Sequence, residues 1–206
     1  MKKGVQFPKN DNGRQNWYNK IMIMDALKNT QKGGSIICLI TGPAGSGKSS
    51  TSKALARKFK RSAVIEVDKL RAMVIGGYVR PWPHNEEVDL QLSLSAKNAC
   101  DMATNFMEKG FNVFIDDVVG RKLLEQYSNF FNGKNFQTFL LMPSLESLLN
   151  RFDDRGNDKE LRERTVELHK QFSEKKDNLS WQVLDSSTQS LEETVEQIYR
   201  KINDTN

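Results

Sequence analysis

The sequence predicts an α/β fold in which helices cover both faces of a parallel β-sheet. Two observations predict it. Short apolar runs, each suited to one buried strand, alternate along the chain with longer segments whose apolar residues recur every three to four positions. A glycine-rich segment, 42–49, lies directly between the first such run and the first helical segment. Because strands that alternate with helices pair in parallel and are covered on both sides, we expect one domain built around such a sheet.

The expected elements follow one another in a regular order. Strands are expected at 35–41, 63–67, 112–115, 136–141 and 183–184. Helices are expected at 50–59, from 68, at 85–109, at 120–131, from 143, over 151–177 and at 190–202. Gly110 is placed to end the longest of these helices. Before the first strand we expect an N-terminal extension, 1–33, with a short helix over 15–29; residues 34–206 then form the domain.

Composition limits the class of protein. The chain has 206 residues, of which 37% are hydrophobic and 28% charged, a balance that suits one globular domain with a real core. The net charge of +5 suits a polyanionic ligand but does not by itself indicate nucleic acid. The polar start of the chain does not resemble a signal peptide, and no apolar run approaches the roughly 18–20 residues of a membrane span. Cys38 and Cys100 have no metal or redox spacing, so we expect two buried thiols in a cytoplasmic protein.

The glycine-rich segment fits the phosphate-binding loop, or P-loop, pattern of Gly, four residues, then Gly-Lys-Ser. It reads Gly42-Pro43-Ala44-Gly45-Ser46-Gly47-Lys48-Ser49 and is followed by Ser50. Its glycines allow a backbone to approach a polyphosphate closely, and the start of the next helix adds N–H groups that favour an anion. Lys48 is expected to reach the β- and γ-phosphates and the Ser49 hydroxyl to bind Mg²⁺. We therefore expect this segment to bind ATP with Mg²⁺.

Carboxylates follow two of the other strands. Asp68 comes at the end of the second strand, where it is suited to cap the next helix and to act as a general base towards an acceptor hydroxyl. Asp116 and Asp117 follow the third strand, the pattern that places a carboxylate near Mg²⁺. Because successive strand residues face opposite ways, only one of the two is expected to serve the metal, and we favour Asp116.

Arginines and aromatic residues complete the candidate site. Arg151 and Arg155 share a helical face, and we expect them on a lid, about 150–177, that closes on the phosphates. For Arg162 and Arg164, a lid role and a salt-bridged surface role are equally well supported by the sequence. The aromatic residues Tyr78, Trp82 and Phe106 could line an acceptor pocket or anchor loops. His84 and His169 are expected at the surface.

These motifs together resemble the small P-loop phosphotransferases grouped around chloramphenicol phosphotransferase and zeta-toxin-like kinases. The resemblance runs from about 35 to 203 and is carried by five segments: the loop at 42–49, Val67-Asp68-Lys69-Leu70-Arg71, 113–118, 151–156 and 184–188. It implies a nucleoside-kinase-like, three-layer fold with a five-stranded parallel sheet and an arginine-bearing helical lid. It implies ATP–Mg²⁺ as donor and a small-molecule hydroxyl as acceptor. We expect Asp68, Arg71, Tyr78, Trp82 and Asp117 to contact that acceptor. The resemblance also implies the base role of Asp68, lid roles for Arg151 and Arg155, and a nucleobase-side position for Ser187 and Thr188.

Other functions compete with this interpretation. Asp117-Val118-Val119-Gly120 fits the switch pattern of a GTPase, but the sequence has no Asn/Thr-Lys-x-Asp guanine-binding motif. A mechanical AAA-type ATPase usually has a longer chain and an Asp-Glu pair after the third strand. A nucleoside monophosphate kinase or a polynucleotide 5′-hydroxyl kinase is the runner-up, and a non-catalytic nucleotide-binding module is a further alternative. The sequence does not identify the acceptor or the oligomeric state.

Overall fold

The structure, a computed structural model, describes residues 34–153, 159–175 and 180–204. The N-terminal extension, with its expected helix, and Arg155 lie outside the described residues, so the predictions made for them stay predictions. From Ser35 onward the chain belongs to one compact unit.

The five strands of the sheet all run parallel. They are β1 (Ile37–Thr41), β2 (Ser62–Glu66), β3 (Asn112–Asp116), β4 (Phe136–Leu141) and β5 (Gln182–Leu184). Their order across the sheet is β2-β3-β1-β4-β5, so β1 is central and pairs with β3 on one side and β4 on the other. The predicted α/β fold with a five-stranded parallel sheet is therefore confirmed.

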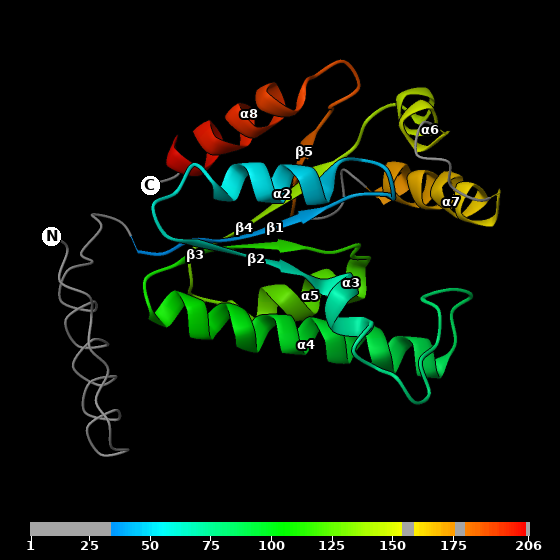
Figure 1. Ribbon diagram of the computed structural model, residues 1–206, viewed down its shortest axis with the longest axis horizontal. Coiled ribbons are helices and arrows are strands. Elements are labelled where there is room, and N and C mark those ends of the chain that lie inside the picture. The colour runs from blue at the N-terminus through cyan, green and yellow to red at the C-terminus, as the bar shows by residue number, and fades with distance from the viewer. Residues whose placement is uncertain (1–33, 154–158, 176–179, 205–206) are drawn as a thin grey trace, which may run out of the picture. The chain divides into compact units, whose positions relative to one another are not determined.

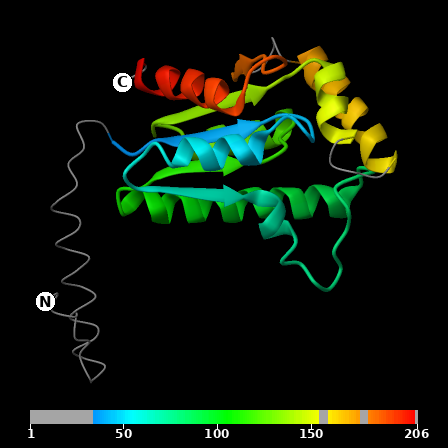
Figure 2. The same ribbon diagram turned by 45° about the horizontal axis from the view of Figure 1, so that its top comes forward.

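Helices cover both faces of this sheet. They are α2 (Lys48–Ala56), α3 (Val67–Arg71), α4 (Glu86–Glu108), α5 (Arg121–Phe130), α6 (Leu145–Asp153), α7 (Lys159–Lys175) and α8 (Leu191–Asp204). Figure 1 shows α2 and α8 on one face and α4 and α5 on the other, which gives three layers. In both views α6 and α7 lie past the carboxyl ends of the strands (Figure 2). Within the described part of the chain, no helix combines the length and apolar character needed to cross a membrane.

The core lies in two layers because neighbouring residues of a strand face opposite sides of the sheet. Ile37 of β1 packs in the cluster that contains Ala99 of α4. The next residue, Cys38, packs in the other cluster with Leu55 of α2 and Ile198 of α8. Burial on both faces explains why the central strands are continuous apolar runs rather than alternating ones.

Both cysteines are buried free thiols, as the sequence predicts. Burial raises the pKa of Cys38 far above its ordinary value and is the main reason that the pKa of Cys100 rises to about 12. A thiol that stays protonated at neutral pH is a poor nucleophile and metal ligand, so both residues act as small apolar side chains.

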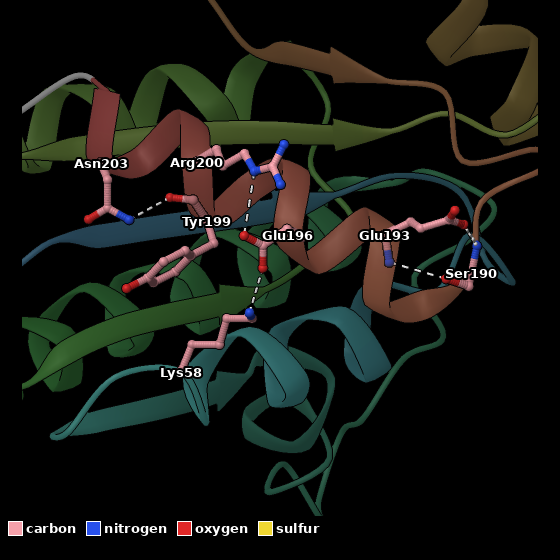
Figure 3. Close-up of polar contacts among 7 residues, drawn as sticks. All are labelled: Lys58, Ser190, Glu193, Glu196, Tyr199, Arg200 and Asn203. Carbon is pink, nitrogen blue, oxygen red and sulfur yellow. Dashed lines mark hydrogen bonds and ion pairs between the residues drawn. The ribbon is translucent and has the colours of Figure 1, made fainter.

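The last helix shows how local sequence fixes an element boundary. Ser190 Oγ accepts a hydrogen bond from the Glu193 N–H at 3.1 Å, and the Glu193 carboxylate accepts one from the Ser190 N–H at 2.8 Å (Figure 3). This reciprocal cap satisfies two N–H groups at the start of α8. Further along the helix, the Glu196 carboxylate lies 2.6 Å from Lys58 Nζ, which ties α8 to the segment after α2 (Figure 3). That ion pair is exposed and contributes little; the apolar layer beneath it holds α8 in place.

The boundary between β2 and α3 differs from the sequence prediction. Val67 was expected to end the strand, but it is the first residue of α3. The N-cap of α3 is Glu66, whose backbone is extended, so the prediction that Asp68 caps the helix is wrong. Asp68 instead lies within the first turn of α3. Val67 has a β-branched side chain, which favours a strand in a sequence-based prediction. The structure buries it in the core at the start of the helix instead.

Candidate functional site

The P-loop connects β1, the central strand, to the start of α2. Gly42, Gly45 and Gly47 have φ angles of +147°, +80° and +95°, a region that residues with a Cβ rarely adopt. At Gly42 a Cβ would also lie 2.4 Å from the carbonyl oxygen of Leu141, which is too close for any side chain. The loop therefore requires glycine for its backbone path, and α2 begins at Lys48, within the last two residues of the motif.

Polar groups converge inside this loop. Lys48 Nζ donates to the carbonyl oxygen of Pro43 at 3.1 Å, and the Ser46 N–H donates to the same oxygen at 3.2 Å. The Ser46 hydroxyl is buried and has no hydrogen-bond partner within the described residues. Ala44 borders a cavity, and Ser50 is exposed on the first turn of α2. A buried hydroxyl without a partner beside a ring of positive-φ glycines is suited to an anionic ligand.

Asp116 lies beside this loop, at the end of β3. The charge of Lys48 and the polar side chain of Ser49 both act on its carboxylate. Burial raises the pKa of Asp116, and Lys48 and Ser49 partly oppose that effect. A carboxylate and a hydroxyl are the hard oxygen ligands that Mg²⁺ accepts, so the chemistry of these two groups fits that ion.

Asp117 faces the opposite way from Asp116. It accepts a hydrogen bond from the Tyr127 hydroxyl at 2.9 Å and another from the Val118 N–H at 2.8 Å. Burial raises the pKa of Asp117 to about 6, and the bond from Tyr127 limits the rise. Asp117 is almost fully buried and does not border the cavity, so the substrate contact expected from the sequence would need the site to rearrange.

Asp68 and Arg71 form an ion pair one helical turn apart on α3. The two partners differ in their surroundings: the Asp68 side chain is 73% exposed, whereas that of Arg71 is 10% exposed. Arg71 Nε is buried and has no hydrogen-bond partner within the described residues. The pair thus presents a solvent-facing carboxylate from Asp68, held by a guanidinium beneath it.

A cavity of about 790 Å³ joins the P-loop to these residues. Ala44 of the loop lies at its border, and Asp68, Arg71, Tyr78 and Trp82, all named from the sequence, line it. Phe106, the third aromatic candidate, packs edge-on against Phe111 and belongs to the core instead. Four residues predicted as substrate contacts therefore share one cavity that opens onto the P-loop.

On the far side of the loop, Arg151 reaches the segment between β5 and α8. Its Nη2 donates to the carbonyl oxygens of Ser186 at 2.6 Å and Ser187 at 3.4 Å. Ser187 Oγ in turn accepts from the Ser144 N–H at 2.7 Å, and Thr188 follows it in the same loop. Arg151 is thus next to the residues expected on the nucleobase side. Its expected partner in the lid, Arg155, lies outside the described residues.

Sequence reasoning predicted no cavity position for three residues, Arg164, Phe172 and Trp181, which all line the cavity. For Arg164 it left a lid role and a salt-bridged surface role open. The side chain of Arg164 is only 12% exposed and pairs with Glu167 at 2.6 Å, so it is not a solvated surface arginine. Positions 161, 164, 168 and 172 recur at helical spacing on α7 and all face the cavity. The sequence spacing shows that these positions share one face of the helix, but it does not show which part of the protein that face contacts.

The two histidines differ in their exposure to solvent. His84 is exposed, as expected, and lies 3.4 Å from Asp89 at the rim of the cavity. His169 is half-buried, with Nε2 3.1 Å from the carbonyl oxygen of Pro143, so the expectation of a surface position holds only in part.

Several solved structures of known proteins have this fold. Among the solved structures with the same fold are a gluconokinase from Sinorhizobium meliloti 1021, at 19% identity and a TM-score of 0.61, and a shikimate kinase from Acinetobacter baumannii in complex with shikimate, at 14% identity and a TM-score of 0.60. The match covers 84% of this chain in both cases, and 93% and 95% of those chains. The tunicamycin resistance protein of Deinococcus radiodurans matches at 17% identity and a TM-score of 0.59, covering 82% of this chain and 95% of that one.

These likenesses support the nucleoside-kinase-like form of the P-loop fold. The finer resemblance to chloramphenicol phosphotransferase stays a prediction. No sequence among the curated proteins matches this chain. A family model described as an AAA domain matches residues 38–177, which is more than half of the chain and includes the P-loop, Asp68 and Asp116. The chain therefore belongs to this AAA domain family, AAA_18.

Proposed function

We propose that the protein is an ATP-dependent phosphotransferase that moves the γ-phosphoryl group of ATP to a hydroxyl of a small molecule. The observation that carries the proposal is the cavity that starts at the P-loop and has the Asp68 carboxylate on its wall. An anion-binding loop and an exposed carboxylate at one cavity are the two parts that transfer to a hydroxyl needs.

The nucleotide is held by the loop in this proposal. The N–H groups of 42–49 and of Ser50 surround the phosphates, and Lys48 leaves the Pro43 carbonyl oxygen to pair with the β- and γ-phosphates. Ser187 and Thr188 lie on the nucleobase side, next to Arg151. Arg151, with Arg155, would reduce the negative charge that develops during transfer.

Ser49 and Asp116 would hold Mg²⁺. The effect of the Ser49 side chain on the pKa of Asp116 supports the placement of both side chains at one ion. When bound, the ion would neutralise phosphate charge and orient the γ-phosphoryl group. Lys48, whose charge acts on Asp116, favours the ionised carboxylate that a metal ligand requires.

Asp68 is the general base. It accepts the proton of the acceptor hydroxyl while that oxygen forms a bond to the γ-phosphorus and the bond from the γ-phosphorus to the bridging oxygen of ADP breaks. The ion pair with Arg71 fixes the position of the Asp68 carboxylate at the cavity wall. Arg71, Tyr78 and Trp82 then contact the acceptor on its other sides.

The solved structures of similar fold agree with this function, because they include kinases named for gluconate and shikimate. The family description alone does not decide between transfer and hydrolysis, since it names no acceptor. The proposal therefore needs a test that separates transfer from hydrolysis.

The test is a transfer screen with ATP labelled in the γ-phosphoryl group. Sugars, nucleosides, nucleoside monophosphates, antibiotics, hydroxy acids and short oligonucleotides are offered, and labelled products are separated from free phosphate. We expect label on a small molecule, and Lys48→Ala should remove it together with ATP binding. Release of free phosphate alone across the whole panel would contradict the proposal, and label on oligonucleotides would assign a nucleic-acid kinase.

A further inference from the structure

The volume and the lining residues of the acceptor cavity limit the class of acceptor that it can bind. At about 790 Å³ it lies in the range that holds a drug-sized molecule. A molecule of the size of a simple sugar would leave much of that space to water. The character of the cavity wall then decides what kind of larger molecule fits.

One side of the wall is aromatic and apolar. Trp82 comes from the loop before α4, and Phe172 and Trp181 come from α7 and the segment before β5. The rings of Phe172 and Trp181 pack against each other with centroids 5.7 Å apart, and both residues are more than nine-tenths buried. These rings therefore form a fixed surface rather than mobile side chains. Such a surface favours a flat or apolar group on the ligand.

The charged residues of the lining are mostly cationic. Among the residues that line the cavity, two are acidic, Asp68 and Asp89, and five are Arg or Lys. Asp89 pairs with Lys122 at 2.9 Å, and Arg80 pairs with Glu160 at 3.2 Å. Arg71 and Arg164 have mostly buried side chains, 10% and 12% exposed. A charge held away from water attracts an anion more strongly than a solvated charge does.

Arg71 is the strongest single indication. The residue is 9% exposed, it lines the cavity, and its Nε has no hydrogen-bond partner within the described residues. The carboxylate in its ion pair, Asp68, is itself mostly in solvent. Burying a guanidinium donor without a partner is unfavourable unless a ligand supplies an acceptor, and an ionised acceptor does so best.

Arg164 approaches the same cavity from α7. Its side chain is 12% exposed, and Glu167, its ion-pair partner, is 56% exposed on the outer side. A guanidinium presents five N–H donors, so one carboxylate partner leaves donors for a second anion. Arg71 of α3 and Arg164 of α7 thus line the same cavity as the aromatic residues.

We propose that the acceptor is an alcohol that carries an anionic group on a ring-bearing, apolar body. Arg71 and Arg164 bind the anion, and Trp82 and Trp181 contact the ring. The anion is a carboxylate or a phosphate, since both accept two parallel hydrogen bonds from a guanidinium. The hydroxyl then lies towards Asp68 and the P-loop. This inference rests on the proposed function for the role of the hydroxyl, but the binding of the anion does not require transfer.

The test measures binding by calorimetry with the full chain, Mg²⁺ and a non-hydrolysable ATP analogue. The probes are one- and two-ring hydroxymethyl arenes, each offered as the carboxylate, the phosphate and the neutral amide, with ringless glycerate beside them. We expect the anionic arenes to bind at least about tenfold more tightly than their amides and than glycerate. The carboxylate and phosphate arms show which anion is preferred. Equal binding of anion and amide, binding of glycerate as tight as that of the arenes, or binding by none of them would overturn the inference.

Two variants assign the anion contact. Arg164→Gln should weaken binding of the anionic arenes about tenfold and leave the amides unchanged. Arg162→Gln, on the exposed side of the same helix, is the matched control and should have no effect. Because Arg71 is buried, Arg71→Lys is used there: it keeps the charge but removes Nε, and it should also weaken anion binding. An Arg164→Gln variant that binds the anionic arenes as tightly as the wild type would contradict the assignment.

The same panel keeps the two proposals apart. Phosphoryl transfer to the neutral amides, with no preference for anions, would overturn this inference and leave the phosphotransferase intact. Tight binding of anionic arenes with no transfer to any alcohol would support the cavity assignment and count against the phosphotransferase.

Discussion

Replacing Asp117 by asparagine tests whether burial raises the pKa of the Asp117 carboxyl. Tyr127 and Val118 donate to different oxygens of Asp117; an asparagine keeps one acceptor oxygen, for the Val118 N–H, and turns an NH₂ donor towards the Tyr127 oxygen, and it removes the charge. In the wild type, burial raises the pKa of Asp117 from 3.8 to about 6. Between these values the native state binds the proton more tightly than the unfolded chain. The carboxylate therefore lowers the free energy of unfolding progressively as the pH rises through this window.

The magnitude follows from the two pKa values. The gap between 3.8 and about 6 corresponds to about 3 kcal/mol over the whole range, and about 1.4 kcal/mol of it falls between pH 5 and pH 8. Asp117→Asn has no such group to titrate. Relative to the wild type, the variant should thus gain about 1.4 kcal/mol of unfolding free energy on going from pH 5 to pH 8.

The assay is urea unfolding at pH 5 and pH 8 at fixed ionic strength, with the free energy obtained by linear extrapolation. Asp101→Asn, at an exposed position of α4, is the matched control: it keeps Asp117 and should therefore keep the pH dependence that Asp117 gives the wild type. A difference between wild type and Asp117→Asn that is the same at both pH values would refute the reasoning, because Asp117 would then not titrate in this window.

Two further predictions concern the surroundings of the site. Gly42→Ala should lower the free energy of unfolding by about 1–3 kcal/mol and abolish ATP binding, because the new Cβ would lie 2.4 Å from the Leu141 carbonyl oxygen. Urea unfolding and ATP titration compare this variant with Gly76→Ala, where nothing lies within 4 Å of the new Cβ. Equal stability of the two variants would contradict the prediction. Tyr127→Phe removes the donor to Asp117 and should lower the free energy of unfolding by about 1–3 kcal/mol at pH 8 and by less at pH 5, where the Asp117 carboxyl is mostly protonated. A loss independent of pH would indicate a packing effect instead.

The parts of the molecule that the sequence predicted are those set by local patterns. Continuous apolar runs predicted strands buried on both faces, and the burial of Ile37 and Cys38 in opposite layers shows why the runs do not alternate. The glycines of the P-loop predicted positive φ angles, which they have. The alternation of strand residues also predicted that Asp116 and Asp117 face different ways, and their partners, Ser49 and Tyr127, lie on different elements.

The parts that the sequence did not predict depend on contacts between distant segments. Arg164, Phe172 and Trp181 line one cavity with Asp68, about 100 residues earlier in the chain, only because α7 lies across the carboxyl ends of the strands. Propensity and spacing show that α7 has an apolar face, but not what that face covers. The start of α3 was missed for a similar reason: Val67 is buried whether it ends a strand or begins a helix.

The central claim is that Asp68 activates an acceptor hydroxyl next to a nucleotide held by the P-loop. Its most direct test is to measure ATP affinity and γ-phosphoryl transfer for Asp68→Asn beside the wild type, with an acceptor found in the transfer screen. We predict that the dissociation constant for ATP stays within about twofold, while transfer falls by about 10²–10⁴-fold. Transfer at the wild-type rate with ATP binding intact would contradict the claim.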